Sequence, residues 1–248
     1  MNKKKTSKKD IENDSRNFIL RGLSIAAIVF VFYSLGLIPV FLIAKILFTF
    51  LNFGALLNLL IMPFFVVFIF FVFLLSEIII TSSMINLFNL KYEEGINDLN
   101  LKDKMFYKFT VCSLTYLPLN MTMGLLSLTP LCQLQAKLMG AKIGKNVLLV
   151  GRINDPCLTE IGNNSVIGGL SIIAAHAGEQ KLILKKVKIG KNCVVGGGAH
   201  IMPGVTMEDY STLGAMGLAT KNQLLKKGKK YGGIPAREIK KQGLKSYA

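Results

Sequence analysis

Residues 189–206 read IGKNCVVGGGAHIMPGVT, which is three six-residue units in succession. Each unit opens on a large aliphatic residue, Ile189, Val195 or Ile201. A short period of this kind is typical of chains that coil through short strands and tight bends, with one large apolar side chain of each unit pointing inward. The stretch therefore predicts a coiled β-structure rather than a sandwich or a helical bundle.

The same period extends in both directions from this stretch. Units begin at Ile143, Leu149, Asp155, Ile161, Ile167, Ile173, Ile189, Val195, Ile201, Met207, Leu213 and Ala219. The second position is glycine in six of them, at 144, 162, 168, 190, 196 and 214, where we expect glycine to permit the bend. Three units close one triangular turn, so 143–160, 161–178, 189–206 and 207–224 predict four stacked coils with a shared core.

Two exceptions interrupt the pattern. Asp155 stands where a large aliphatic residue is expected, and residues 179–188 break the register by ten positions. We interpret both as places where something other than core packing is required.

Upstream of the repeat lie two long apolar runs, Gly22–Ala44 and Phe53–Ser76. Each is long enough for the roughly 20 residues that cross a bilayer as a helix. The only charged side chain between positions 22 and 76 is Lys45. Helices apolar on all sides would need a larger core than this chain supplies, and the first run exceeds a signal peptide's apolar region. We predict two transmembrane helices.

The charges and the uncharged stretches divide the chain further. Residues 1–21 carry seven basic and three acidic side chains, which places the N-terminus in the cytoplasm by the positive-inside rule. Segment 111–131 is uncharged but contains Pro118 and Pro130, so we expect an interfacial or re-entrant segment, and whether it crosses the membrane stays open. The expected regions are a basic tail (1–21), two transmembrane helices (22–80), a connector (81–137), the repeat domain (138–241) and a C-terminal tail (242–248).

Three features accompany the repeat: DPCLTEIG at 155–162, His176 before the inserted residues, and GGIPAR at 232–237. Together they resemble the hexapeptide-repeat acyltransferases, and most of all the membrane-attached branch that includes the C-terminal region of membrane-bound nonribosomal peptide synthetases of the polylysine-synthetase kind. The resemblance implies a mainly β domain, a left-handed parallel β-helix of about four coils, preceded by the N-terminal helical transmembrane region. It also implies a homotrimer. General crossover chirality alone favours the opposite hand.

In that family an acyl group passes from a coenzyme A thioester to a hydroxyl or amine, and a histidine acts as general base. The matching residue is His176, and we expect Glu179 to accept a hydrogen bond from its other ring nitrogen. Asp155 and Glu160 are expected to orient the acceptor, although Glu160 also fits an ordinary surface position. For the donor, the resemblance points to Gly214, Ala215, Lys221, Gly232, Gly233, Pro235, Ala236 and Arg237, with Lys221 or Arg237 meeting phosphate. The run Lys226, Lys227, Lys229 and Lys230 fits phosphate or anionic lipid equally well.

The composition argues against several other classes of protein. The chain is 51% hydrophobic, which argues against disorder, and its four cysteines lack the close spacing of a disulfide scaffold. Two histidines are too few for a three-histidine zinc site, so no metal is expected, and His200 is interpreted as a surface residue. The net charge of +16 comes without a basic element interleaved with aromatic residues, which argues against nucleic-acid binding.

Two functions follow as hypotheses. The first is an acyltransferase anchored in the cytoplasmic membrane, with its β-helix in the cytoplasm, that transfers an acyl group, most simply acetyl, to an envelope or lipid-linked acceptor. The alternative is a noncatalytic trimeric scaffold or accessory module of a membrane-bound synthetase.

Overall fold

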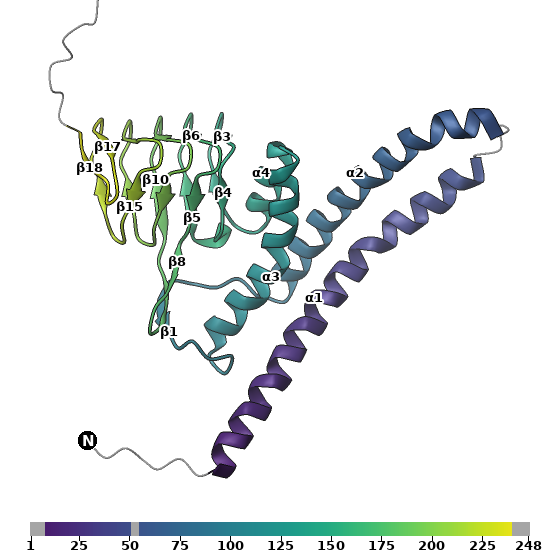
Figure 1. Ribbon diagram of the computed structural model, residues 1–248, viewed down its shortest axis with the longest axis horizontal. Helices are drawn as coiled ribbons and strands as arrows, with labels where there is room; N and C mark the ends of the chain where they lie inside the picture. The colour runs from purple at the N-terminus through teal and green to yellow at the C-terminus, as the bar shows by residue number, and fades with distance from the viewer. Residues whose placement is uncertain (1–7, 51–54, 240–248) are drawn as a thin grey trace, which may run out of the picture. The chain divides into compact units, whose positions relative to one another are not determined.

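The computed structural model describes residues 8–50 and 55–239 of the chain. Contacts divide it into two compact units (Figure 1). A helical unit holds residues up to Leu90 together with Asp98–Thr115, and a second unit holds Lys91–Asn97 and the chain from Tyr116 onward. The expected tail 242–248 lies outside the described residues, as do positions 1–7.

The helical unit is built on α1 (Lys8–Phe50), α2 (Ala55–Leu87) and the first part of α3 (Lys104–Leu125). Within α1 and α2, the stretches Arg16–Thr49 and Leu59–Leu87 are long and apolar enough to cross a membrane. Large apolar side chains such as Phe30, Phe41 and Phe64 are exposed on them. A soluble helix pair would bury such side chains, so these two helices match the two runs expected to be apolar on all sides.

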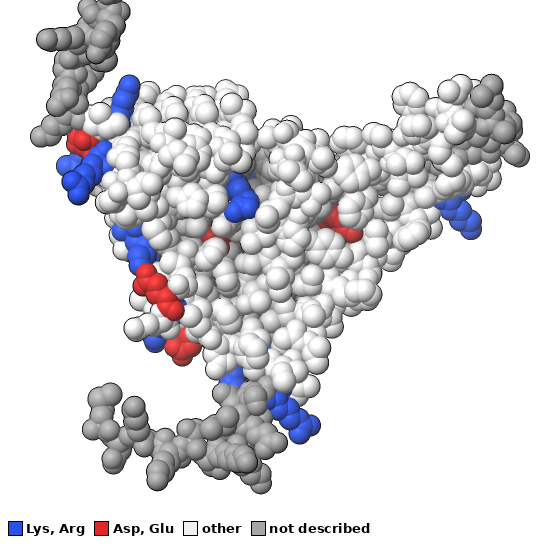
Figure 2. Space-filling view, viewed as in Figure 1, with Lys and Arg blue, Asp and Glu red and all other residues white. Residues whose placement is uncertain are grey.

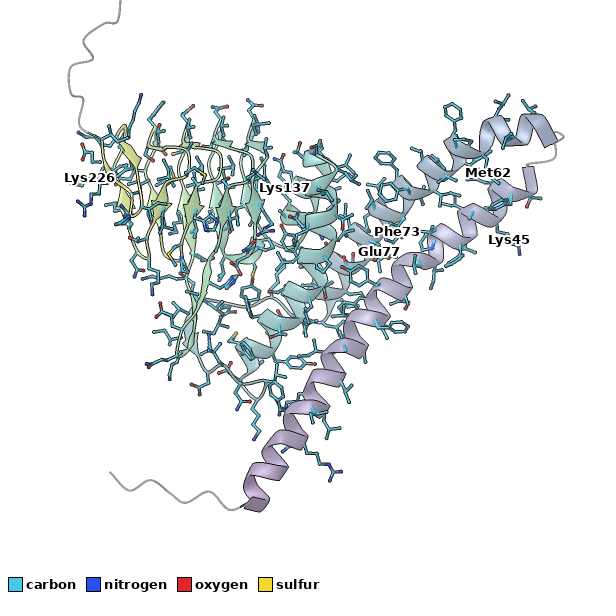
Figure 3. The ribbon with its side chains drawn as sticks, in the orientation of Figure 1. Lys45, Met62, Phe73, Glu77, Lys137 and Lys226 are labelled. Carbon is cyan, nitrogen blue, oxygen red and sulfur yellow. The ribbon has the colours of Figure 1, made fainter. Side chains whose placement is uncertain are left out.

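A close approach joins α1 to α2 at Gly36. The Ser76 hydroxyl donates to the Gly36 carbonyl oxygen at 2.6 Å, and a Cβ on Gly36 would overlap the Glu77 carboxyl group. Glu77 is fully buried, and neither of its carboxyl oxygens has a hydrogen-bond partner among the described residues (Figure 3). Phe32 stacks on Phe88 with ring centroids 6.1 Å apart. The buried Glu77 side chain therefore occupies the space that glycine leaves open at position 36.

Segment 111–131, expected to be interfacial or re-entrant, is divided between two helices. Helix α3 ends at Leu125, and α4 (Thr129–Leu138) starts with a proline in its first turn. The buried Gln135 side chain of α4 donates to the Tyr116 carbonyl oxygen at 3.3 Å and accepts from Asn120 at 3.2 Å. Polar side chains of this region thus join α4 to the second half of α3.

The second unit contains a parallel β-helix with three faces (Figure 1). The first face stacks β2 (Lys142–Ile143), β5 (Thr159–Ile161), β10 (Val187–Ile189), β13 (Thr206–Met207) and β16 (Leu224–Leu225). The second stacks β3 (Leu148–Leu149), β6 (Val166–Ile167), β11 (Val194–Val195), β14 (Thr212–Leu213) and β17 (Lys230–Gly232), and β18 (Arg237–Glu238) closes it antiparallel to β17. The third stacks β4 (Arg152–Ile153), β7 (Ile172–Ile173), β12 (His200–Ile201) and β15 (Leu218–Ala219). The parallel coils are confirmed, whereas their left-handed sense stays a prediction of the resemblance.

The core of the β-helix is formed by the first residues of the units. Ile161 pairs in register with Ile189, and Ile167 with Val195, and all four are at most 3% exposed. Full burial of one such side chain contributes about 1.5–3 kcal/mol. Because each coil covers only its neighbours, the burial accumulates along the stack.

The glycines at the second position serve a different purpose from the one expected. Left-handed backbone occurs at the fourth position instead, for example at Asn146, Asn164 and Asn192, with φ between 53° and 57°. Asparagine tolerates this conformation better than most residues. A Cβ on Gly162 would lie 2.6 Å from the carbonyl carbon of Gly190. The expectation that this glycine permits the bend is therefore wrong, because close stacking of adjacent coils requires it.

The first coil also departs from the expected register. Ile153, which pairs with Ile173, fills the inward place that the six-residue count assigned to position 155. The chain then makes a 3₁₀ turn, η1 (Pro156–Leu158), before β5. Asp155 is thereby released from the stack and is available for another role.

The insertion after His176 is a β-hairpin rather than an irregular loop. Strand β8 (His176–Gly178) pairs antiparallel with β9 (Leu182–Leu184), and β9 pairs antiparallel with β1 (Gly95–Asn97). Figure 1 shows β8 and β1 extending away from the stacked coils. No pattern in the connector indicates that it supplies a strand to this hairpin.

Candidate active site

Asp155 and His176 form the centre of the candidate site. Asp155 lies just before η1, and His176 is the first residue of β8. The imidazole Nδ1 is 2.7 Å from Asp155 Oδ2 and 2.9 Å from Oδ1. The Asp155 side chain is fully buried, whereas that of His176 is 28% exposed. The imidazole is therefore bound through Nδ1 to a buried carboxylate, and part of the ring is exposed to solvent.

Two more donors complete the surroundings of the Asp155 carboxylate. The backbone N–H of Ala175 donates to Oδ2 at 2.7 Å, and the Tyr92 hydroxyl donates to Oδ1 at 2.7 Å. A buried carboxylate is costly unless hydrogen bonds compensate for lost solvation, and here both oxygens have donors. This network explains why an aspartate interrupts the apolar pattern at position 155.

The network sets the protonation state of His176. Burial lowers the pKa of the imidazole, but the hydrogen bond and the negative charge of Asp155 raise it, and the net shift is upward. Because a carboxylate only accepts hydrogen bonds, Nδ1 carries the proton. The lone pair of the neutral ring then lies on Nε2, which is the arrangement of a general base.

Glu179 does not have the role expected for it. Its carboxylate forms an ion pair with the Lys221 ammonium, and the carboxylate that holds Nδ1 of His176 is Asp155. The expectation failed because Asp155, 21 positions upstream, reaches the ring from the neighbouring coil. The pair of Glu179 and Lys221 instead ties the hairpin turn to the corner after β15.

The two residues expected to orient the acceptor occupy other places. The Asp155 oxygens are buried and taken up by protein donors, so Asp155 supports His176 rather than touching an acceptor. Glu160 forms an ion pair with Lys142 at 2.9 Å on the first face. That hydrogen bond lowers the pKa of the Glu160 carboxyl group. The position fits the surface alternative for Glu160.

Most residues expected at the donor gather near the last coil. Gly214 N–H donates to the Tyr231 carbonyl oxygen at 2.7 Å, beside Gly232. The turn before β18 packs on β15, since Ala236 N–H donates to the Leu218 carbonyl oxygen at 2.8 Å. Figure 2 shows basic side chains gathered over the end of the β-helix where β17 and β18 lie. The residues brought together here are Gly214, Ala215, Gly232, Gly233, Pro235, Ala236 and the exposed Arg237, while Lys221 belongs to the corner bound to Glu179.

Tyr92 is the site residue that sequence reasoning missed. It is separated from Asp155 by 63 positions and lies in a connector expected to hold interfacial or re-entrant helices. No period or motif marks it. Tyr92 also interacts with Cys157, whose thiol pKa is raised to about 11, chiefly by burial. Among the described residues no group of three or more histidine, cysteine, aspartate or glutamate side chains is arranged to hold a metal ion.

Comparison with protein families gives one match. Residues 186–216 match the family model described as bacterial transferase hexapeptide (six repeats). This is the part of the repeat that runs from β10 through β14. No curated protein matches the chain.

Solved structures with a similar arrangement include several acetyltransferases. One is a hexapeptide-repeat-containing acetyltransferase from Vibrio cholerae, with 14% identity, a TM-score of 0.43, and coverage of 54% of this chain and 92% of that one. A galactoside acetyltransferase in complex with coenzyme A has 19% identity and a TM-score of 0.41, covering 53% of this chain and 81% of that one. A maltose O-acetyltransferase from Clostridium difficile 630 has 19% identity and a TM-score of 0.39, covering 53% and 87%.

Proposed function

We propose that this protein is a membrane-anchored acyltransferase that moves an acyl group, most simply acetyl, from coenzyme A to a hydroxyl or amine of an envelope or lipid-linked acceptor. The observation that carries the proposal is the 2.7 Å contact between His176 Nδ1 and a buried Asp155, at the point where a hexapeptide-repeat coil gives way to a hairpin. The match of residues 186–216 to the transferase hexapeptide family supports it.

The reaction follows from the protonation state of the ring. The acceptor oxygen or nitrogen attacks the thioester carbonyl carbon while His176 Nε2 takes the acceptor's proton. The C–S bond then breaks, and the imidazolium returns the proton to the leaving thiolate, which yields the acylated acceptor and free coenzyme A. The Asp155 carboxylate stabilises the imidazolium between these two proton transfers. General base catalysis of this kind contributes about 10²–10⁴-fold in rate.

The donor site belongs to the same proposal. Gly214 and Ala215 would let the pantetheine arm approach the coil edge, and Arg237 would meet phosphate near the turn formed by Gly233, Pro235 and Ala236. Lys221 is the second candidate for phosphate, and its pairing with Glu179 places it beside the hairpin that bears His176.

Membrane anchoring and trimer formation complete the proposal. Helices α1 and α2 are long and apolar enough to span a bilayer, and the basic N-terminal tail favours a cytoplasmic N-terminus. Outward positions on three strands of the second face are apolar, namely Leu148, Val166 and Val194, which are 54%, 36% and 41% exposed, and Thr212 and Lys230 continue the row in β14 and β17. An apolar stripe along a β-helix is a surface that a second copy would cover.

The test uses the full chain purified in detergent. We expect it to bind acetyl-coenzyme A in a calorimetric titration, and to transfer labelled acetyl groups to a component of an envelope lipid extract. His176→Ala should keep donor binding and lose transfer by about a hundredfold or more. His200→Ala removes the other histidine, an exposed residue of β12, and should retain transfer.

Two results would contradict the proposal. Transfer by His176→Ala at the parent rate would exclude the base mechanism. A folded protein that binds no coenzyme A ester and co-purifies with a large synthetase would favour the scaffold alternative.

A further inference from the structure

Seven residues of the connector, Lys91–Asn97, belong to the β-helix unit although the chain on both sides of them belongs to the helical unit. We call this segment the strap. Strand β1 at its end pairs antiparallel with β9, with Ile96 opposite Ile183. Nearby, the Glu94 carboxylate accepts the backbone N–H of Lys186 at 2.8 Å. The strap is therefore fixed to the hairpin whose other strand begins with His176.

We propose that Tyr92 is a positioning residue of the transferase, acting through Asp155 on His176, so that the strap completes the active site. This inference rests on the proposed acyltransferase function. The Tyr92 side chain is 3% exposed, and its hydroxyl donates to Asp155 Oδ1 at 2.7 Å. The same carboxylate is hydrogen-bonded to the His176 ring. Asp155 therefore links the Tyr92 hydroxyl of the strap to the imidazole.

The hydroxyl affects the imidazole through the charge of the carboxylate. A donor on Oδ1 stabilises part of the negative charge of the carboxylate, which weakens the attraction of the carboxylate for Nδ1, and it also fixes the plane of the carboxylate. Asp155 is fully buried, so solvent cannot replace a donor that is lost. Without the hydroxyl, the carboxylate would attract the imidazolium more strongly. His176 would then stay protonated to higher pH, so it would act as a base over a narrower range of pH.

Asp155, just before η1, is the titratable group in contact with His176. Tyr92 of the strap and Cys157 of η1 lie beside Asp155, and Glu179 of the hairpin turn is bound to Lys221. Asp155 is the group whose hydrogen bond and charge raise the pKa of His176. A change at Tyr92 is therefore expected to reach the imidazole through Asp155.

The test measures the titration of His176 directly, without donor or acceptor. The full chain in detergent is treated with diethylpyrocarbonate, which modifies neutral imidazole, across a range of pH values. Peptide mass spectrometry then reports His176 and His200 separately, so His200 serves as an internal reference. Tyr92→Phe should move the half-point of His176 modification upward by about half a pH unit. In turnover, the same variant should lose up to about threefold in kcat near neutral pH, because a rise of about half a pH unit lowers the neutral fraction of His176 by at most that factor, with little change in KM for acetyl-coenzyme A.

A matched control is Tyr231→Phe. Tyr231 is also buried, and its hydroxyl accepts the backbone N–H of Lys226 at 3.1 Å in the last coil. Its loss should leave the His176 half-point unchanged. Should Tyr92→Phe fail to fold, a ring-fluorinated tyrosine at position 92 keeps the shape and makes the hydroxyl a stronger donor. That replacement should move the half-point downward, which is the opposite direction.

The outcomes separate this inference from the proposed function. A His176 half-point that stays in place with Tyr92→Phe or with the fluorinated tyrosine would overturn the role of Tyr92, even if His176→Ala abolishes transfer. Full transfer by His176→Ala would refute the proposed function, whatever the half-point does.

Discussion

Two opposing effects act on the imidazole of His176, and their balance decides how the site responds to pH. Burial lowers its pKa, while the hydrogen bond and charge of Asp155 raise it further than burial lowers it. A base must be neutral to accept a proton, so activity is expected to rise with pH through the raised pKa. The Asp155 carboxylate thus raises the lowest pH at which the enzyme is active. It also fixes the tautomer of His176 and stabilises the imidazolium that forms during transfer.

Asp155→Asn tests this balance at the scale of one residue. The substitution removes the charge and leaves the burial, so the pKa of His176 should fall and the acid limb of the pH–rate profile should move to lower pH. The plateau rate should nevertheless drop by about a hundredfold or more, because an amide that donates to Nδ1 favours the tautomer with its proton on Nε2. The measurement is kcat from pH 5 to 9. An acid limb that moves upward would contradict the assignment.

At the scale of the elements, several second-position glycines lie where adjacent coils approach each other closely. A Cβ on Gly162 would meet the backbone of Gly190 and Lys191 at 2.6–2.7 Å, and backbone cannot move away as a flexible side chain can. Gly162→Ala should therefore lower the free energy of unfolding by about 1–3 kcal/mol through overpacking. Thermal unfolding in detergent measures the change.

Gly178 in β8 supplies the control for that prediction. A Cβ there would have no atom within 4 Å, and its backbone is not in the left-handed region. Gly178→Ala should leave the melting temperature nearly unchanged. Equal losses from both substitutions would mean that the loss of glycine itself, rather than coil stacking, causes the destabilisation.

The elements also explain what could be predicted from the sequence. The stack of Ile161 on Ile189 follows from the six-residue period, because inward side chains must recur at a fixed spacing. His176 followed from its place beside the insertion and from the resemblance. The hydrogen-bond partner of His176 could not be predicted, because the register of the first coil shifts at Ile153 and frees Asp155 from the stack. Tyr92 lies outside the repeat, so only tertiary pairing of the strap reveals it.

At the scale of the whole molecule, a nearly uncharged helical segment is joined to a strongly basic repeat. From position 143 onward there are sixteen basic and six acidic side chains, against the single Lys45 between positions 22 and 76. In the proposed topology, two spans would return the chain to the side on which it began, and the positive-inside rule predicts that this side is the cytoplasm. A basic domain there would face the anionic leaflet, which attracts Lys and Arg by about 1 kcal/mol each near the surface.

This topology predicts the sidedness of two exposed lysines, Lys45 near the end of α1 and Lys226 in the last coil (Figure 3). Each is replaced by cysteine in the full chain and treated with a membrane-impermeant maleimide in intact cells and in inverted vesicles. If α1 starts in the cytoplasm as proposed, Lys45→Cys should react from outside and Lys226→Cys only in inverted vesicles. The unsubstituted chain is the control, because its cysteines at 112, 132 and 193 are buried and Cys157 is half-buried. Reaction of Lys226→Cys in intact cells would mean that segment 111–131 crosses the membrane as a third span, which would place the proposed acyltransferase site outside the cytoplasm.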